Sequence, residues 1–385
     1  MRLPWVMSVL GATAMAAVSC TAPPAPPAVV AGTPAPPPSP SPHKQQAEPR
    51  ARDKVTDVYA HDRPGMLSPK VRGLTPRVYV PNSESNTVDV INPRTYRVVH
   101  RYRVGMLPQH VVPSWDMKTL WVNENKGNRL TPIDPVTGRP GKPVPVDDPY
   151  NLYFTPDGSY ALVMAERNNR LDFRDPDTMR LIHSLELPCR GVNHGDFTAD
   201  GSVFLASCEF SGQLVAIDWK RPRVLKVISV EPANMPQDVK LSPDGRRFYV
   251  ADMMAGGVWI IDADTLRRVG FLRTGRGAHG LYVSRDSRLL YVSNRGEGSV
   301  SVVSFADRKV VDRWQIPGGG SPDMGGVSAD GKQLWLSGRY HGVVYVFSTV
   351  TGKLLHKIKV GQGPHGLCVY PQPGRYSLGH TGIFR

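Results

Sequence analysis

The sequence lacks most of the short motifs that mark enzymes and cofactor proteins. Its four cysteines form no C-x-x-C pair, which argues against a zinc ribbon, a thioredoxin-like motif and a covalently attached c-type haem. The chain also has no Walker motif, no G-x-S-x-G and no H-E-x-x-H. These absences favour a binding module over an enzyme.

The sequence also has little that predicts a membrane span or long helices. The uncharged run at residues 3–18 is too short and too rich in Ala and Gly for a typical span. Gly and Pro each number 37 in 385 residues, which favours turns over helices. The formal net charge of +14 comes from dispersed Lys and Arg, so no clustered basic patch indicates nucleic acid or an anionic membrane.

The first twenty residues resemble an export signal. They end in Ala17-Val18-Ser19-Cys20, which is similar to a bacterial lipobox, in which the cysteine becomes lipidated and N-terminal. The motif predicts lipid attachment at Cys20 and an extracytoplasmic protein anchored to the cell membrane or envelope; ordinary secretion is the alternative. Residues 21–50 contain eleven prolines, so we expect 21–76 to be a Pro-rich tether with an irregular lead-in.

From residue 77 onward the chain repeats a three-stranded meander. In Gly277–Val303, three short runs rich in β-branched and aromatic residues are separated by turn residues, which predicts antiparallel neighbours. Aligned second strands are separated by 42, 41, 43, 44, 42 and 44 residues, which gives seven units. The aligned positions are Tyr79, Trp121, Leu162, Leu205, Tyr249, Tyr291 and Trp335.

A fourth strand follows each meander, such as Lys353–Val360. Four strands in 40–45 residues predict a blade, so the expected fold is all-β, a seven-bladed β-propeller of four-stranded antiparallel blades. Residues 77–104 supply only three strands of the first blade, and His365–Tyr370 supplies its missing innermost strand. The propeller should therefore cover residues 77–375, with its C-terminal strand closing the first blade and 376–385 as a C-terminal tail.

The strands Arg247–Asp252 and Leu290–Asn294 resemble the YVTN-type β-propeller repeat. That family is similar to the haem d1 domain of cytochrome nitrite reductase and to the copper-bearing propeller of nitrous oxide reductase. The resemblance implies a propeller and an extracytoplasmic setting; one enterobacterial periplasmic member binds single-stranded DNA. It does not carry an activity over, because this chain lacks the c-type haem motif and a cupredoxin domain.

In a propeller, the loops that lead into the innermost strands surround one mouth of the channel. Four of the eleven histidines fall in these loops, beside amide and carboxylate side chains. A ligand or metal site could use such a ring; alternatively, each imidazole bonds the backbone of a neighbouring blade. The candidate ligand residues, with one from a neighbouring loop class, are His110, Asn151, His194, Gln237, His279, Arg295, Asp323 and His365.

Two cysteines fall on the same predicted face. In an oxidising compartment, Cys189 and Cys208 are expected to form a disulfide. The alternative is a metal site built from Cys189, His194 and Cys208, whose soft sulfur would favour copper. Cys368 lies in a predicted inner strand and is expected to be buried.

Three functions remain open from the sequence. The first is a monomeric, lipid-anchored binding or scaffold module that takes an envelope protein or a small ligand at its rim and channel mouth. The alternative is a redox or maturation protein that binds copper or a haem-like tetrapyrrole. The third is binding of single-stranded nucleic acid or another polyanion, for which Arg276, Arg295 and Arg339 lie on the predicted face.

Overall fold

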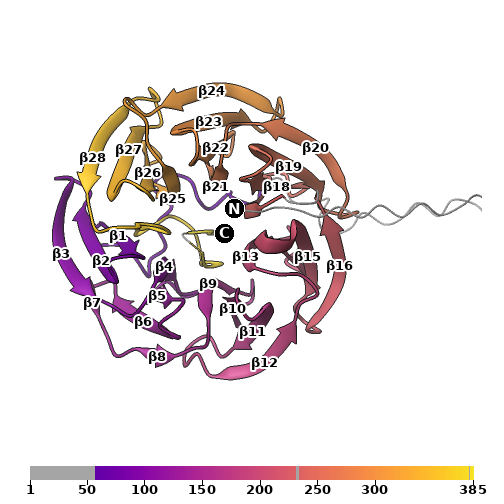
Figure 1. Ribbon diagram of the computed structural model, residues 1–385. Coiled ribbons are helices and arrows are strands. Elements are labelled where there is room, and N and C mark those ends of the chain that lie inside the picture. The colour runs from indigo at the N-terminus through magenta and orange to yellow at the C-terminus, as the bar shows by residue number, and fades with distance from the viewer. Residues whose placement is uncertain (1–56, 231–233, 381) are drawn as a thin grey trace, which may run out of the picture. The chain divides into compact units, whose positions relative to one another are not determined.

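The computed structural model describes residues 57–230, 234–380 and 382–385. The predicted export signal, Cys20 and most of the predicted tether lie outside these residues. Within them, the strands form seven antiparallel sheets, and Figure 1 shows these sheets arranged as blades around a central channel. The prediction of a seven-bladed β-propeller is confirmed.

In the first three blades the strands run from the channel outward. Blade 1 contains β29 (Cys368–Tyr370), β1 (Arg77–Asn82), β2 (Thr87–Asn92) and β3 (Arg97–Arg103). Blade 2 contains β4 (Pro108–Pro113), β5 (Leu120–Glu124), β6 (Arg129–Asp134), β7 (Arg139–Pro140) and β8 (Val144–Pro145). Blade 3 contains β9 (Pro149–Phe154), β10 (Ala161–Ala165), β11 (Arg170–Arg174) and β12 (Leu181–Glu186).

The other four blades follow the same order. Blade 4 contains β13 (Val192–Phe197), β14 (Val203–Cys208), the 3-10 turn η2 (Glu209–Ser211), β15 (Gln213–Asp218) and β16 (Arg223–Ser229). Blade 5 contains β17 (Pro236–Leu241), β18 (Arg247–Asp252), β19 (Gly257–Asp262) and β20 (Arg268–Arg273). Blade 6 contains β21 (Ala278–Val283), β22 (Leu289–Asn294), β23 (Ser299–Ser304) and β24 (Lys309–Gln315). Blade 7 contains β25 (Pro322–Val327), β26 (Gln333–Gly338), β27 (Val343–Ser348) and β28 (Leu354–Lys359).

Burial falls from the channel to the perimeter of each blade. The inner strand β17 is buried along its whole length, and so is β4, whereas the outer strand β3 is mostly exposed. The second strand of each blade packs against neighbouring blades on both faces, so its sequence is a continuous apolar run rather than an alternating pattern. Short polar turns reverse the chain: in blade 5, Ser242 Oγ donates to Asp244 Oδ1 and Gly245 adopts a φ of +71°.

The C-terminal strand closes the ring. Strand β29 pairs antiparallel with β1, with Tyr79 opposite Cys368, as the phase of the repeat predicted. The strand is shorter than the predicted His365–Tyr370, because Gly366 bonds to blade 2 instead of blade 1. The amide of Val111 donates to the carbonyl of Gly366 at 3.0 Å.

The perimeter of blade 2 departs from the four-strand prediction. Its outermost strand is split into β7 and β8, which both pair with β6. Pro140, Pro143 and Pro145 lie in this stretch and have no amide proton to donate, so a continuous ladder cannot form.

The residues after β29 return to the centre of the ring. Leu378, Ile383 and Phe384 are each 1 % exposed, and the C-terminus lies at the centre of the blades (Figure 1). We name the described residues 372–380 and 382–385 the C-terminal plug. The sequence indicated only a tail at 376–385. Among the described segments, no helix has the length and hydropathy needed to cross a membrane.

Candidate functional site

The predicted mouth residues all lie around the channel. Seven of them occur at or next to the start of inner strands and have exposed fractions of 2 % or less: His110, Asn151, His194, Gln237, His279, Asp323 and His365. Arg295 follows β22, and its side chain is 11 % exposed. Gln237 accepts from Asn193 Nδ2 at 3.3 Å, so it belongs to an amide network beside the histidines.

Five histidine rings meet in the channel. His110, His194, His279 and His365 come from the leading loops of four blades, and His380 comes from the C-terminal plug. Centroids of neighbouring rings are 4.9–6.1 Å apart. The predicted clustering of histidines at the channel is therefore present, with a fifth member added.

Three of these histidines have the arrangement of a metal site. One ring nitrogen from each of His110, His194 and His380 lies within 4.8 Å of the others. Within the described residues, the buried Nε2 atom of each ring makes no hydrogen bond, although His380 Nε2 lies 3.6 Å from Asp238 Oδ1. An unpartnered buried polar atom costs roughly 1–3 kcal/mol, so a bound species that satisfies all three would stabilise the site. Ligand nitrogens around tetrahedral zinc are about 3.4 Å apart, so closing on an ion needs a shift of only about 1 Å.

The other ring nitrogens have partners that set the tautomers. His110 Nδ1 is 2.9 Å from the carbonyl oxygen of Tyr150, so it carries the proton and leaves the Nε2 lone pair free. Asn151 Nδ2 lies 3.0 Å from Nδ1 of both His194 and His380 and donates to them. Binding an ion at Nε2 of these two rings requires their protons to move to Nδ1. The Nδ1–H groups would then need an acceptor, and the one that Asn151 offers is its amide oxygen, which accepts from the amide of Leu152 at 2.9 Å.

Asp323 holds the other two histidines. Its Oδ2 is 2.7 Å from Nδ1 of His365, and its Oδ1 is 3.1 Å from Nδ1 of His279. Arg295 Nη1 lies 3.3 Å from Asp323 Oδ1 and balances the carboxylate charge. The phenol of Tyr150 lies 3.4 Å from His365 Nε2. Both histidines of this group therefore have polar partners, although the Nε atom of Arg295 is buried without a hydrogen bond among the described residues.

Burial keeps the whole cluster neutral. Desolvation lowers the pKa of His110 to about 3, and it lowers the pKa of the other four imidazoles well below the usual range. A neutral imidazole is the form that binds a metal ion. Nearby, burial raises the pKa of the carboxyls of Glu166 and Glu209, and for Glu166 the charge of Glu209 adds to the rise.

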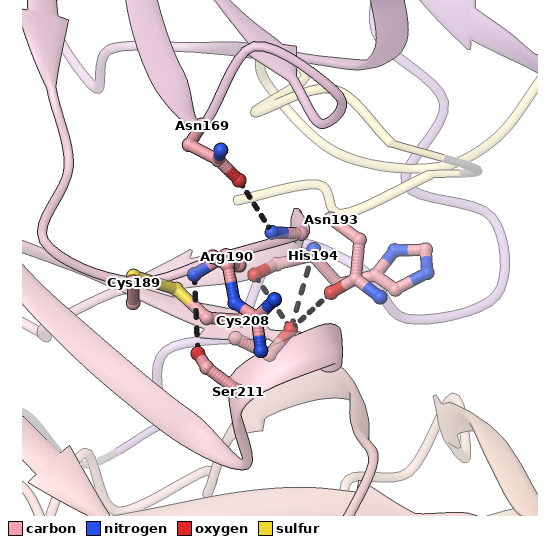
Figure 2. Close-up of a disulfide and its surroundings, with 9 residues drawn as sticks. Asn169, Cys189, Arg190, Asn193, His194, Cys208 and Ser211 are labelled. Carbon is pink, nitrogen blue, oxygen red and sulfur yellow. Dashed lines mark hydrogen bonds between the residues drawn. A yellow bond between two sulfur atoms is a disulfide. The ribbon is translucent and has the colours of Figure 1, made fainter.

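A disulfide joins the loop before β13 to the end of β14. Cys189 and Cys208 are bonded, with their Cα atoms 5.9 Å apart, and Figure 2 shows the bond beside Asn193 and His194. Neither sulfur is then available as a thiolate, so the metal set of Cys189, His194 and Cys208 does not form in this structure. His194 lies instead with His110 and His380. Cys368 is a free, buried thiol.

His380 is the candidate ligand that the sequence reasoning missed. It lies beyond the last repeat, so no alignment of blades points to it. The signal that could have found it is the apolar spacing of Leu378, Ile383 and Phe384, which is unusual for a free tail. A histidine between such residues is drawn into the core with them.

A sequence model of one family, described as YNCE-like beta-propeller, matches residues 71–374. The chain belongs to the YNCE-like beta-propeller family. This result confirms the resemblance to YVTN-type repeats. No curated protein matched the chain.

Solved structures with the same fold have varied functions. Hydrazine synthase of Kuenenia stuttgartiensis is 18% identical, covering 74% of this chain and 97% of that chain, with a TM-score of 0.61. A putative 6-phosphogluconolactonase from Bacteroides uniformis is 18% identical over 77% of this chain and 100% of that one, with a TM-score of 0.61. The dihydro-heme d1 dehydrogenase NirN is 13% identical over 79% and 76%, with a TM-score of 0.58. At these identities, the comparison establishes the fold alone.

Proposed function

We propose that this propeller is a binding protein that holds a first-row transition-metal ion in its channel. The observation that carries the proposal is the buried cluster of His110, His194 and His380: one ring nitrogen of each lies within 4.8 Å of the others, and the Nε2 atom of each makes no hydrogen bond within the described residues. The Tyr150 carbonyl already fixes one ring with its Nε2 lone pair free. Such an outer hydrogen bond is the usual support of a metal-binding imidazole.

The ligand set favours borderline metals. Three imidazoles suit zinc, copper, nickel or iron, whereas calcium and magnesium prefer oxygen ligands. With both candidate sulfurs in the disulfide, the soft-ligand argument for copper alone no longer applies. Three histidine ligands leave a further coordination position on the ion. The neighbouring His279 and His365 are protein side chains that could fill it.

The competing functions have less support. A tetrapyrrole in the channel would have to displace the C-terminal plug, whose residues are buried there. Polyanion binding would use Arg276, Arg295 and Arg339, but Arg295 pairs with Asp323, and Arg339 donates to Ser83 Oγ at 2.9 Å. Two of the three guanidinium groups therefore already have partners within the protein.

Stripped of metal with a chelator, the protein is expected to bind one equivalent of Zn²⁺, Cu²⁺ or Ni²⁺ and no Ca²⁺. Calorimetric titration measures the stoichiometry and the Kd. Loss of one of three ligands in His194→Ala should weaken Zn²⁺ binding by at least about 100-fold. The exposed His183 supplies a matched control, because His183→Ala should bind as the wild type does. Absence of stoichiometric binding, or equal affinity in His194→Ala, would refute the proposal.

We also propose that the protein is exported and anchored by lipid at Cys20. The lipobox-like Ala17-Val18-Ser19-Cys20 supports this location. A disulfide between Cys189 and Cys208 is consistent with an oxidising compartment, since cytosolic proteins rarely keep one.

The location is tested in a bacterial host by fractionation and thiol labelling. The wild type is expected in the membrane fraction, and Cys20→Ser in the soluble fraction. After acid quenching, Cys189 and Cys208 should resist alkylation until a reductant is added. Full labelling of both thiols without reductant, or wild type and Cys20→Ser in the same fraction, would contradict the proposed location.

A further inference from the structure

The C-terminal plug is built differently from the rest of the channel wall. It belongs to no blade, and it crosses the inner strands of blades 2 and 3 after the ring has closed. The amide of Phe154 donates to the carbonyl of Leu378 at 2.9 Å, and the amide of His380 donates to the carbonyl of Leu152 at 2.8 Å. Ser377 Oγ donates to the carbonyl of Pro113 at 3.2 Å. The plug is therefore docked by its own hydrogen bonds, which can form or break without opening a blade.

The plug is also held at its end. Arg385 Nη2 lies 2.9 and 3.2 Å from the two carboxylate oxygens of Asp196, and both side chains are buried. The guanidinium lies 4.5 Å from the ring centroid of Tyr59, in the lead-in, whose hydroxyl donates to the carbonyl of Leu241. A buried ion pair whose two charges have few alternative partners fixes one position for the end of the chain.

The plug supplies one ligand of the candidate metal site. His110 and His194 are fixed by their blades, whereas His380 reaches them only when the plug is docked. The ring centroids of His380 and His194 are then 4.9 Å apart, and those of His380 and His110 are 5.3 Å apart. Docking brings its Nε2 to 3.6 Å from Asp238 Oδ1, but the atom makes no hydrogen bond in the described chain.

Resting on the proposed metal binding, we infer that the C-terminal plug is the closing element of the site. The ion binds between the blade histidines and His380, so ion occupancy and plug docking stabilise each other. An ion that requires the docked state shifts the equilibrium by mass action. At an ion concentration 100 times Kd, the undocked population falls about 100-fold.

The structure offers a variant that disturbs docking and keeps every ligand. Gly379 has a φ of +96°, and a Cβ there would lie 2.5 Å from the carbonyl oxygen of Leu152. Alanine at this position must therefore push the plug away from β9. Gly318 is the matched control, because it also has a positive φ but has no atom within 4 Å of an added Cβ.

The test is amide hydrogen exchange of the whole protein with and without Zn²⁺, followed at Leu378 and His380. In the wild type, Zn²⁺ at 100 times Kd should slow exchange of these amides about 100-fold. His380→Ala should lose this protection and weaken Zn²⁺ binding as much as His194→Ala does, because each variant removes one of the three ligands. Gly379→Ala should also bind more weakly, whereas Gly318→Ala should match the wild type.

The outcomes separate the two proposals. If the wild type binds Zn²⁺, but His380→Ala and Gly379→Ala bind it equally well and show the same protection, the plug is not part of the site and this inference falls alone. If the wild type binds no Zn²⁺ and its plug amides exchange at one rate with or without it, both proposals fall.

Discussion

A chain that ends at Gln362 is expected not to form the closed ring. It loses strand β29, which pairs with β1, and the plug that fills the channel. The lost apolar side chains are all 6 % exposed or less: Leu367, Cys368, Val369, Tyr370, Leu378, Ile383 and Phe384. At about 1.5–3 kcal/mol for each large side chain, their burial is comparable with the total stability of a domain, about 5–15 kcal/mol. Circular dichroism should show no cooperative thermal transition.

Two further truncations separate the effect of closing the ring with β29 from the effect of filling the channel with the plug. A chain that begins at residue 57 keeps every contact described above, so its melting temperature should equal that of the full chain. A chain that ends at Gly374 keeps β29 but loses most of the plug, so it should fold with a lower melting temperature. Equal melting temperatures for the chains that end at Gln362 and begin at residue 57 would contradict the closure of the ring by β29.

The metal-free protein is expected to lose much of its stability between pH 7 and pH 5. Burial lowers the pKa of five imidazoles below the value of about 6.5 that they have in the unfolded chain. Below that pH the unfolded chain takes up protons that the folded protein does not. The contribution of the five neutral imidazoles to the free energy of unfolding is therefore complete above pH 6.5 and is lost as the pH falls. Five such groups correspond to about 7 kcal/mol per pH unit.

Three buried carboxyls oppose this trend. Burial raises the pKa of Glu166 and Glu209, and it raises the pKa of Asp62 to about 6. Because the folded protein takes up protons on these carboxyls at a higher pH than the unfolded chain does, they oppose the loss of stability as the pH falls. The net loss of stability is therefore smaller than the five imidazoles alone would cause.

Urea denaturation in the presence of a chelator, at pH 7 and pH 5, measures this difference. His110→Gln should flatten the pH dependence by about 1.4 kcal/mol per pH unit, because one imidazole no longer takes part. The matched variant His183→Gln removes an exposed imidazole and should keep the slope of the wild type. Equal free energies of unfolding at the two pH values would show that the cluster is not kept neutral by burial.

The fold could be predicted from the sequence because it repeats. The register of Tyr79, Trp121 and their equivalents gives the number of blades, and the missing first strand gives the closure. The exceptions have local causes. Prolines split the outer strand of blade 2, and Gly366 bonds to blade 2, which shortens β29.

The site could be predicted only as far as the repeat extends. The four blade histidines share one loop position, so their meeting follows from the topology. His380 lies outside any repeat, and only three-dimensional packing brings it to His194. The tautomers set by Tyr150 and Asn151 also depend on distances that sequence spacing does not contain.

The lead-in meets the propeller on the face opposite the channel mouth. The amide of Val58 donates to the carbonyl of Pro243, and Asp62 pairs with Arg285, both at the far ends of inner strands. The described chain therefore begins on that far face, at Asp57. The mouth, with Phe210, Met254 and Tyr340 each more than half exposed, lies on the opposite face, so the lead-in from residue 57 leaves this rim open to solution.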